Sequence, residues 1–166
     1  LKISKKVTGN LGDITKAFDF TVTVEGANDT YTTKKTAANG TTSFGEITFN
    51  AENALLELKH NESIEIFSLA VNADFIITED SNTLSGHTPT PSGDWTETTG
   101  NTASGSIQSD VTQAVIFTNY KQSVPVTPEP TPPEPTTQPT TQPSTVPSTE
   151  PTTEPITEPK VQSTTE

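Results

Sequence analysis

Proline divides this chain into two parts that cannot share one fold. Twelve of the fourteen prolines lie after Lys121, and from Pro135 to Pro159 a proline recurs at every fourth residue. Between them the chain is mostly Thr, Ser, Gln and Glu, so few apolar side chains are available to offset the entropy of folding. Such a tract favours the extended polyproline II conformation. We therefore predict a folded domain at residues 1–121 and a Pro/Thr-rich low-complexity stalk or linker at residues 122–166.

The regular spacing of these prolines favours a spacer that holds a folded domain away from a surface. At about 3.1 Å per residue, roughly 40 residues of polyproline II would span on the order of 120 Å. Threonines beside prolines can also carry O-linked glycans, which would stiffen the tract further. The alternative interpretation is an ordinary flexible linker.

The charge and the missing residue types exclude several classes of protein. The formal net charge is −12, and all nine basic residues are lysine. Such a chain lacks the basic face that binds nucleic acid or an anionic membrane surface. Without cysteine, the domain must be held by packing or by another kind of covalent bond, and thiol catalysis and cysteine metal sites are excluded. Because the chain opens on Leu1 and has no long apolar stretch, we expect any secretion or anchoring signal to lie outside it.

Within residues 1–121 the apolar side chains recur at every second position, which is typical of half-buried strands. Phe18, Phe20, Val22 and Val24, for example, alternate with polar residues. No segment has a sustained helical period. The sequence therefore predicts an all-β fold, an immunoglobulin-like β-sandwich, with strands at 1–7, 18–24, 31–33, 47–49, 54–60, 63–67, 75–79 and 111–119.

Two connecting segments carry their own signals. Residues 26–29, Gly-Ala-Asn-Asp, indicate a hairpin-like turn into the strand at 31–33. Residues 81–105 are rich in Ser, Thr, Gly, Asn and Pro, so we expect short edge strands and loops there, around Trp95.

Three polar residues share the phase of the apolar positions. Lys5 is in phase with the apolar residues of the first strand, Glu79 with those of the seventh, and Asn119 with those of the last. Because alternate residues of a strand lie on one face, each should point into the core. A buried lysine or glutamate is rare unless it is paired. These three residues are therefore the main candidates for chemistry.

Three segments around these residues resemble a known family. They are LKISKKVTGN at residues 1–10, ITED at 77–80 and VIFTN at 115–119. In this order they are similar to the first strand, the acidic strand motif and the closing strand of Gram-positive pilin and adhesin domains with internal isopeptide bonds. The resemblance covers residues 1 to about 121. It implies that a lysine amine attacks an asparagine side-chain amide, releases ammonia and leaves a Lys–Asn isopeptide bond, assisted by a carboxyl group.

Transferred by position, the resemblance implies that Lys5 and Asn119 form the crosslink and that Glu79 assists. Burial favours the neutral forms of amines and carboxyl groups; a neutral amine is nucleophilic, and a protonated carboxyl group can polarise the amide. Proximity in a dry core supplies the rest of the rate. The event occurs once per molecule, so we expect maturation rather than turnover. The alternative is a buried Lys–Glu pair beside a hydrogen-bonded asparagine, with no covalent bond.

Other residues are weaker candidates. His60 and His87 are far apart in the sequence, have no metal-binding spacing and are expected at exposed loops or strand ends. Asp74, Glu79 and Asp80 do not have the spacing of a calcium loop, and no catalytic triad motif is present. We therefore expect no enzyme activity, no cofactor and no metal.

Together these features predict a structural stalk module of a bacterial pilin or adhesin, located at the cell wall or surface of a Gram-positive bacterium. The expected partners are neighbouring domains of the same surface protein, with no nucleic acid and no membrane contact in this part. The alternative function is an adhesin domain that binds a host protein or glycan. Trp95 could stack on a sugar in that case, although a partly buried structural tryptophan is the simpler interpretation.

Overall fold

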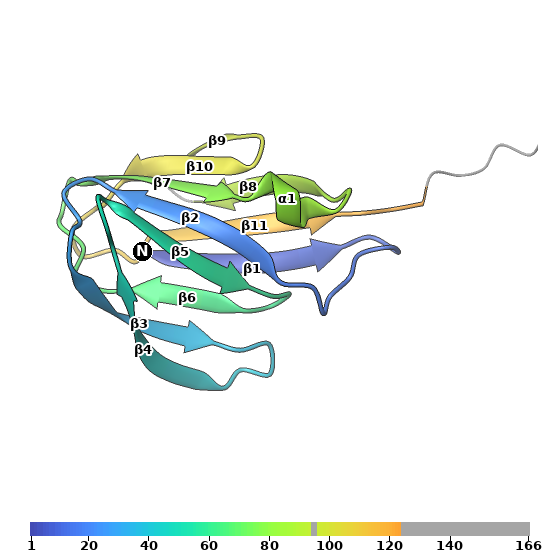
Figure 1. Ribbon diagram of the computed structural model, residues 1–166, viewed down its shortest axis with the longest axis horizontal. Helices are drawn as coiled ribbons and strands as arrows, with labels where there is room; N and C mark the ends of the chain where they lie inside the picture. Colours follow the sequence, from blue (N-terminus) through green and yellow to red (C-terminus); the bar gives the residue numbers. More distant parts are fainter. Residues whose placement is uncertain (94–95, 124–166) are drawn as a thin grey trace, which may run out of the picture. The chain divides into compact units, whose positions relative to one another are not determined.

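The computed structural model describes residues 1–93 and 96–123, which form two β-sheets packed face to face (Figure 1). This arrangement confirms the predicted all-β sandwich. The predicted stalk from residue 124 onward, and the interpretation of Trp95, lie outside the described residues.

The sheets differ in size, and the larger one contains both the first and the last strand. Its six strands, in spatial order, are β4 (Thr42–Thr48), β3 (Thr30–Thr36), β6 (Ser63–Ile66), β1 (Lys2–Thr8), β11 (Ala114–Tyr120) and β8 (Thr88–Gly93). The five strands of the smaller sheet are β5 (Asn53–Leu58), β2 (Phe18–Val24), β7 (Asp74–Glu79), β10 (Thr102–Ser106) and β9 (Thr96–Thr99). A single-turn helix, α1 (Ser81–Leu84), follows β7.

The core lies between the sheets and is built from alternate side chains of the strands. In β2, Phe18, Phe20, Val22 and Val24 are buried, whereas the residues between them are more exposed. Burying one such side chain contributes about 1.5–3 kcal/mol to folding. Leu55 falls out of the inward phase of β5, and it is 80% exposed.

The first and last strands pair side by side near the centre of the larger sheet. β1 runs parallel to β11 and antiparallel to β6. In the parallel register Lys5 lies opposite Phe117, and Val7 lies opposite Asn119. Lys5 and Asn119 therefore share the inner face and are offset by two residues along it. Parallel neighbours cannot be joined by a tight turn and need a longer connection. Here that connection is nearly the whole domain, since β1 and β11 are the first and last strands.

The structure corrects the hairpin expected at residues 26–29. β2 belongs to the smaller sheet and β3 to the larger, so this turn carries the chain from one sheet to the other. Gly26 has φ of 72°, a conformation that glycine adopts without steric cost. Turn residues signal a reversal of the chain, but they do not specify which sheet the next strand joins.

The last strand begins later than predicted. It starts at Ala114 rather than at residue 111, and Val111 is 54% exposed. The residues before it form a loop that the buried Gln113 holds in place. Its Nε2 donates to the carbonyl of Ser106 at 2.7 Å, and its Oε1 accepts from the backbone N–H of Gln108 at 3.1 Å.

Residues 81–105 were predicted to form short edge strands, which is confirmed for β8 and β9 and wrong for β10. β8 and β9 are edge strands, but β10 lies between β7 and β9. β8 carries Pro89 and Pro91, which an edge strand tolerates because N–H groups on its open side have no neighbouring strand to pair with. The helical turn α1 was not expected; Asp80 caps it by accepting a hydrogen bond from the backbone N–H of Asn82 at 2.9 Å.

Candidate functional site

Lys5, Glu79 and Asn119 meet in the core between the two sheets. Lys5 and Asn119 project from β1 and β11 of the larger sheet, and Glu79 is the last residue of β7 in the smaller sheet. Lys5 is 2% exposed, and the other two residues are 0% exposed. Their inward phase on three separate strands is what turns all of them toward the core.

One carboxylate oxygen joins the three side chains. Glu79 Oε1 accepts a hydrogen bond from Lys5 Nζ at 2.7 Å and another from Asn119 Nδ2 at 2.7 Å. The lysine–glutamate contact is a fully buried ion pair. The amine nitrogen that could attack an amide and the amide nitrogen that could leave are therefore bound to the same oxygen, which can carry a proton between them.

The amine of Lys5 lies among aromatic rings. Its Nζ is 4.3 Å from the centroid of the Phe18 ring and 5.8 Å from that of Phe20. Burial lowers the pKa of Lys5 to about 8, although the hydrogen bond to Glu79 and the charge of that carboxylate partly counteract it. Near neutral pH a larger fraction of this amine is therefore neutral and nucleophilic than for an exposed lysine.

Two acceptor atoms of the site have no hydrogen-bond partner among the described residues. They are Glu79 Oε2 and Asn119 Oδ1. Buried polar atoms are nearly always paired, so unpaired acceptors at one place favour a chemical role over a purely structural one. Asn119 Oδ1 is the atom on which negative charge would develop if an amine attacked the amide carbon.

The end of β7 is fixed by backbone contacts. The N–H of Glu79 donates to the carbonyl of Asn101 at 2.9 Å, and Asn101 Nδ2 donates to the carbonyl of Glu79 at 2.6 Å. These two bonds hold the backbone that carries the carboxylate. Such preorganisation is what an amide exchange in the core would need.

The expectation that both histidines are exposed was wrong for His87. Its side chain is 6% exposed and packs edge to face against Phe18, with ring centroids 5.4 Å apart. The sequence carries no clear signal for its burial, because the residues that follow it in phase are Pro89 and Pro91, and proline does not mark a buried face. His60 is partly buried, and its Nδ1 accepts a hydrogen bond from the backbone N–H of Val7 at 2.8 Å.

The acidic residues considered for a cation are used separately. Asp80 caps α1, and Asp74 accepts a hydrogen bond from Ser106 on the outer face of the smaller sheet. Among residues 1–93 and 96–123, no three His, Cys, Asp or Glu residues gather as metal ligands would. In the same part of the chain, no helix has the length and apolar character needed to cross a membrane.

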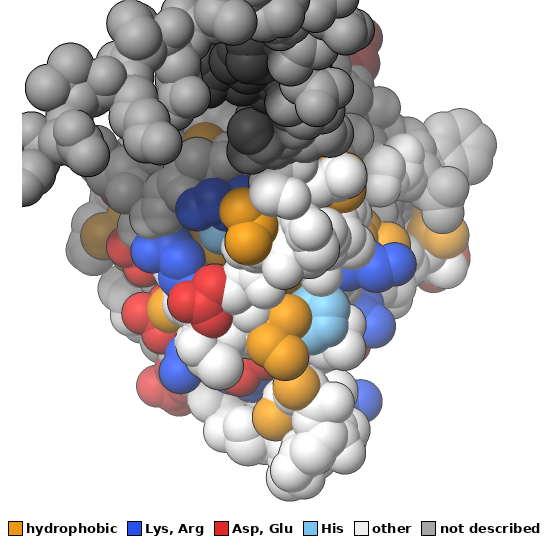
Figure 2. Space-filling model, turned by 90° about the vertical axis from the view of Figure 1, so that its right-hand side faces the viewer, with side chains coloured by type: hydrophobic (Ala, Val, Ile, Leu, Met, Phe, Trp, Pro, Cys, Tyr) orange, Lys and Arg blue, Asp and Glu red, His pale blue; other side chains and the backbone are white. Residues whose placement is uncertain are grey.

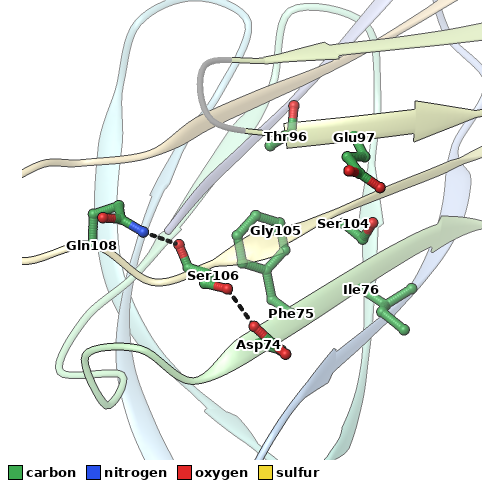
Figure 3. Close-up of a pocket in the computed structure, with 9 residues that line it drawn as sticks. All are labelled: Asp74, Phe75, Ile76, Thr96, Glu97, Ser104, Gly105, Ser106 and Gln108. Atoms are coloured by element: carbon green, nitrogen blue, oxygen red, sulfur yellow. Dashed lines mark hydrogen bonds between the residues drawn. The ribbon is translucent and has the colours of Figure 1, made fainter.

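A shallow groove of about 670 Å³ lies on the outer face of β7, β10 and β9 (Figure 3). Asp74, Ser106 and Gln108 lie along one side of it and are hydrogen-bonded in series, with Gln108 Nε2 donating to the carbonyl of Ser106 at 3.1 Å. These bonds tie β7 to the end of β10. None of Lys5, Glu79 and Asn119 lines this groove, so it is separate from the buried site.

Comparison with known proteins finds a family match and similarity to pilus proteins. Residues 1–121 match the family model described as a domain of unknown function, DUF7601. A pilin of Streptococcus pyogenes serotype M1 is 30% identical over 132 residues, a match that covers 73% of this chain and 38% of that protein.

Solved structures of pilus proteins are also similar to this chain. The major pilin from Streptococcus pyogenes aligns with a TM-score of 0.64 and 25% identity, covering 74% of this chain and 47% of that one. A pilus-presented adhesin aligns with a TM-score of 0.57 and 25% identity, covering 74% of this chain and 27% of that one. The chain therefore spans less than half the length of these relatives.

Proposed function

This chain belongs to the DUF7601 family, and we propose that it is a structural module of a Gram-positive pilus, stabilised by an isopeptide bond between Lys5 and Asn119. Its similarity to a pilin, a major pilin structure and a pilus-presented adhesin supports a structural or adhesive role at the surface of a Gram-positive bacterium. Within that role, the internal crosslink is the specific claim that the buried site supports.

The observation that carries the proposal is the shared oxygen of Glu79. A buried ion pair alone would need only Lys5 and Glu79, and removing such a pair often costs a protein nothing if apolar residues replace it. Here Asn119 Nδ2 is bound to the same Oε1, and Asn119 Oδ1 is unpaired among the described residues. Amine, amide and proton carrier are therefore assembled in one water-poor place.

The reaction balances without any other reagent. Lys5 Nζ gives a proton to Glu79, which leaves a neutral amine beside a carboxylic acid. The amine attacks Asn119 Cγ, so that a Nζ–Cγ bond forms while charge builds on Oδ1. Glu79 then returns its proton to Nδ2 and accepts one from Nζ. The Cγ–Nδ2 bond breaks, and the products are a secondary amide and one molecule of ammonia.

A crosslink at these positions would suit a module under load. It would join the first strand to the last and close a loop of more than a hundred residues. By analogy with disulfides of that loop length, it would stabilise the domain by about 4–5 kcal/mol through chain entropy. A pull on the two ends would pass through the crosslink and bypass the residues between.

The division at residue 121 remains part of the proposal. Residues 122–166 would act as a stalk or spacer beside the domain. The first part of this segment is held by the β1–β2 loop, since Asn10 Nδ2 donates to Ser123 Oγ at 3.2 Å and Ser123 N donates to Asn10 Oδ1 at 3.1 Å. The hydrogen bonding of the folded domain therefore extends to Ser123.

An adhesive role is the second candidate, and the similarity to a pilus-presented adhesin favours it. The partner would be a host protein or glycan. Binding of the chain to a glycan array or to host extracellular-matrix proteins would support this role, and it would be compatible with the crosslink.

Intact mass tests the crosslink directly. We expect the purified chain to be lighter than its sequence by one molecule of ammonia, and fragmentation to find Lys5 joined to Asn119. A mass equal to that of the sequence would show that the three residues form only a noncovalent cluster.

A further inference from the structure

His87 lies at the end of the inner face that carries Asn119. Pro89 is directly opposite Asn119 in the pairing of β8 with β11, and His87 precedes Pro89 by two residues on the same face. This is the end of the domain at which α1 and the β1–β2 loop lie. Figure 2 looks onto that end, where lysine, acidic and apolar side chains are interspersed on the surface.

The tautomer of His87 is fixed by its surroundings. Its Nδ1 lies 2.6 Å from the carbonyl oxygen of Leu84. A carbonyl can only accept, so Nδ1 carries the proton and donates it. Nε2 of the neutral ring is then an acceptor, and it has no hydrogen-bond partner among the described residues.

Phe18 connects His87 to the reacting amine. The imidazole packs against the Phe18 ring at 88°, with centroids 5.4 Å apart, while Lys5 Nζ lies 4.3 Å from the centroid of the same ring. His87 is therefore only one ring away from the amine, and its 6% exposure places it at the boundary between the core and solvent.

Unpaired polar atoms are concentrated in this region. Three buried side-chain atoms in the described part of the chain lack a partner: Glu79 Oε2, Asn119 Oδ1 and His87 Nε2. Gln113, which is also buried and polar, uses both its amide oxygen and its amide nitrogen. Each of these three atoms can accept a hydrogen bond. Ammonia, the leaving group of the proposed crosslink, offers three N–H donors.

We propose that His87 Nε2 accepts a hydrogen bond from the ammonia released by Lys5 and Asn119 and guides it out of the core. This role rests on the proposed crosslink. No bond to His87 forms or breaks; ammonia passes as the neutral molecule and takes up a proton in solvent. Rapid exit matters because ammonia held in the site could attack the new amide and reverse the reaction.

Two lysine side chains lie near the groups that His87 contacts. Lys121 Nζ donates to the carbonyl of Ser85 at 2.8 Å, beside the turn that leads to His87. Lys16 Nζ lies 5.8 Å from the centroid of the Phe18 ring.

The test uses the full chain, recovered unfolded from inclusion bodies and diluted out of guanidinium while intact mass is followed over time. His87→Phe keeps a ring against Phe18 but removes the acceptor. The backbone N–H of His87 still donates to Leu84, so that carbonyl stays paired. His87→Gln restores an acceptor near the position of Nε2. We expect H87F to slow ammonia loss at least about tenfold and H87Q to stay within about threefold of wild type.

A structural role is separated from this one by a second measurement. In a Lys5→Met background, where no crosslink can form, H87F and its parent should fold at the same rate and melt at the same temperature. Equal rates of ammonia loss in H87F and wild type would overturn the role of His87 and leave the crosslink standing. If the wild type loses no ammonia, the crosslink itself fails, and this role fails with it. Should H87F not fold, His87→Met against H87Q makes the same comparison.

Discussion

Lys5 and Asn119 lie on the same face of two neighbouring parallel strands. They are offset by two residues in register, because Val7 rather than Lys5 is opposite Asn119. Diagonal neighbours across a strand pair are about 7–8 Å apart, a span that a lysine side chain can bridge. The register therefore sets the reach of the amine, and Glu79 from the facing sheet meets both groups midway.

Replacing the amine should remove the crosslink and reveal its contribution to stability. Lys5→Met keeps most of the buried volume, so we expect it to fold, to retain the full mass and to lose about 4–5 kcal/mol in free energy of unfolding. Mass spectrometry and guanidinium denaturation measure the two effects. Lys6→Met on the exposed face of the same strand is the matched control and should change neither.

Replacing the carboxyl group should block the chemistry while leaving the fold intact. Glu79→Gln has the same shape but cannot carry a proton from Lys5 to the leaving nitrogen, so ammonia loss on refolding should slow by about 10²–10⁴-fold. Glu57→Gln, on an exposed position of β5, should react at the wild-type rate. Complete crosslinking in E79Q would mean that the carboxyl group is not the proton carrier.

The uncrosslinked domain should become more stable as pH rises through the alkaline range. In Asn119→Leu the amine stays free, and its pKa is about 8 in the folded chain against 10.5 for an ordinary lysine. Between these values the unfolded chain binds a proton that the folded chain has lost, so folding is favoured as pH increases. We expect a gain on the order of 3 kcal/mol between about pH 8 and 10.5, measured by urea unfolding.

A second variant isolates the titration of Lys5 from that of other groups. The double variant Lys5→Met, Asn119→Leu lacks the buried amine and should show no such gain over the same range. An equal rise in both variants would assign the pH dependence to other residues.

The close packing of Gly9 against Lys121, the residue that follows β11, should tolerate no side chain at position 9. Gly9 has φ of 88°, and a Cβ there would overlap the backbone carbonyl of Lys121. Gly9→Ala should therefore cost about 1–3 kcal/mol and disturb the hydrogen bonds that Lys121 makes to Thr8 and Leu11. Denaturant midpoints measure the loss. In Gly40→Ala φ is similar, at 85°, but the Cβ meets nothing within 4 Å, so the difference between the variants reports the steric contact.

Much of the candidate site followed from the sequence because strands have a period of two. That period fixes which residues of a strand share a face, so it assigned Lys5, Glu79 and Asn119 to the interior, and it left Leu55 outside. This rule does not reach His87, because the residues that follow it in phase are prolines, which do not mark a buried face.

Two other features of the fold cannot be predicted from the alternation of side chains. The turn at residues 26–29 has the composition of a hairpin but crosses between sheets, because sheet membership depends on long-range pairing rather than on turn residues. The late start of β11 depends on Gln113, whose side chain ties down the preceding loop through two hydrogen bonds. Local composition carries no information about either.

The alternation of side chains along an extended backbone is enough to assign the face on which Lys5, Glu79 and Asn119 lie, because that face depends only on local spacing. Their meeting depends on long-range pairing and packing. Parallel pairing put β1 beside β11, and packing of the second sheet brought the end of β7 against both. The hydrogen bonds of Glu79 to Lys5 and to Asn119 join residues that are 74 and 40 positions apart in the sequence. A two-residue period carries no information over such separations.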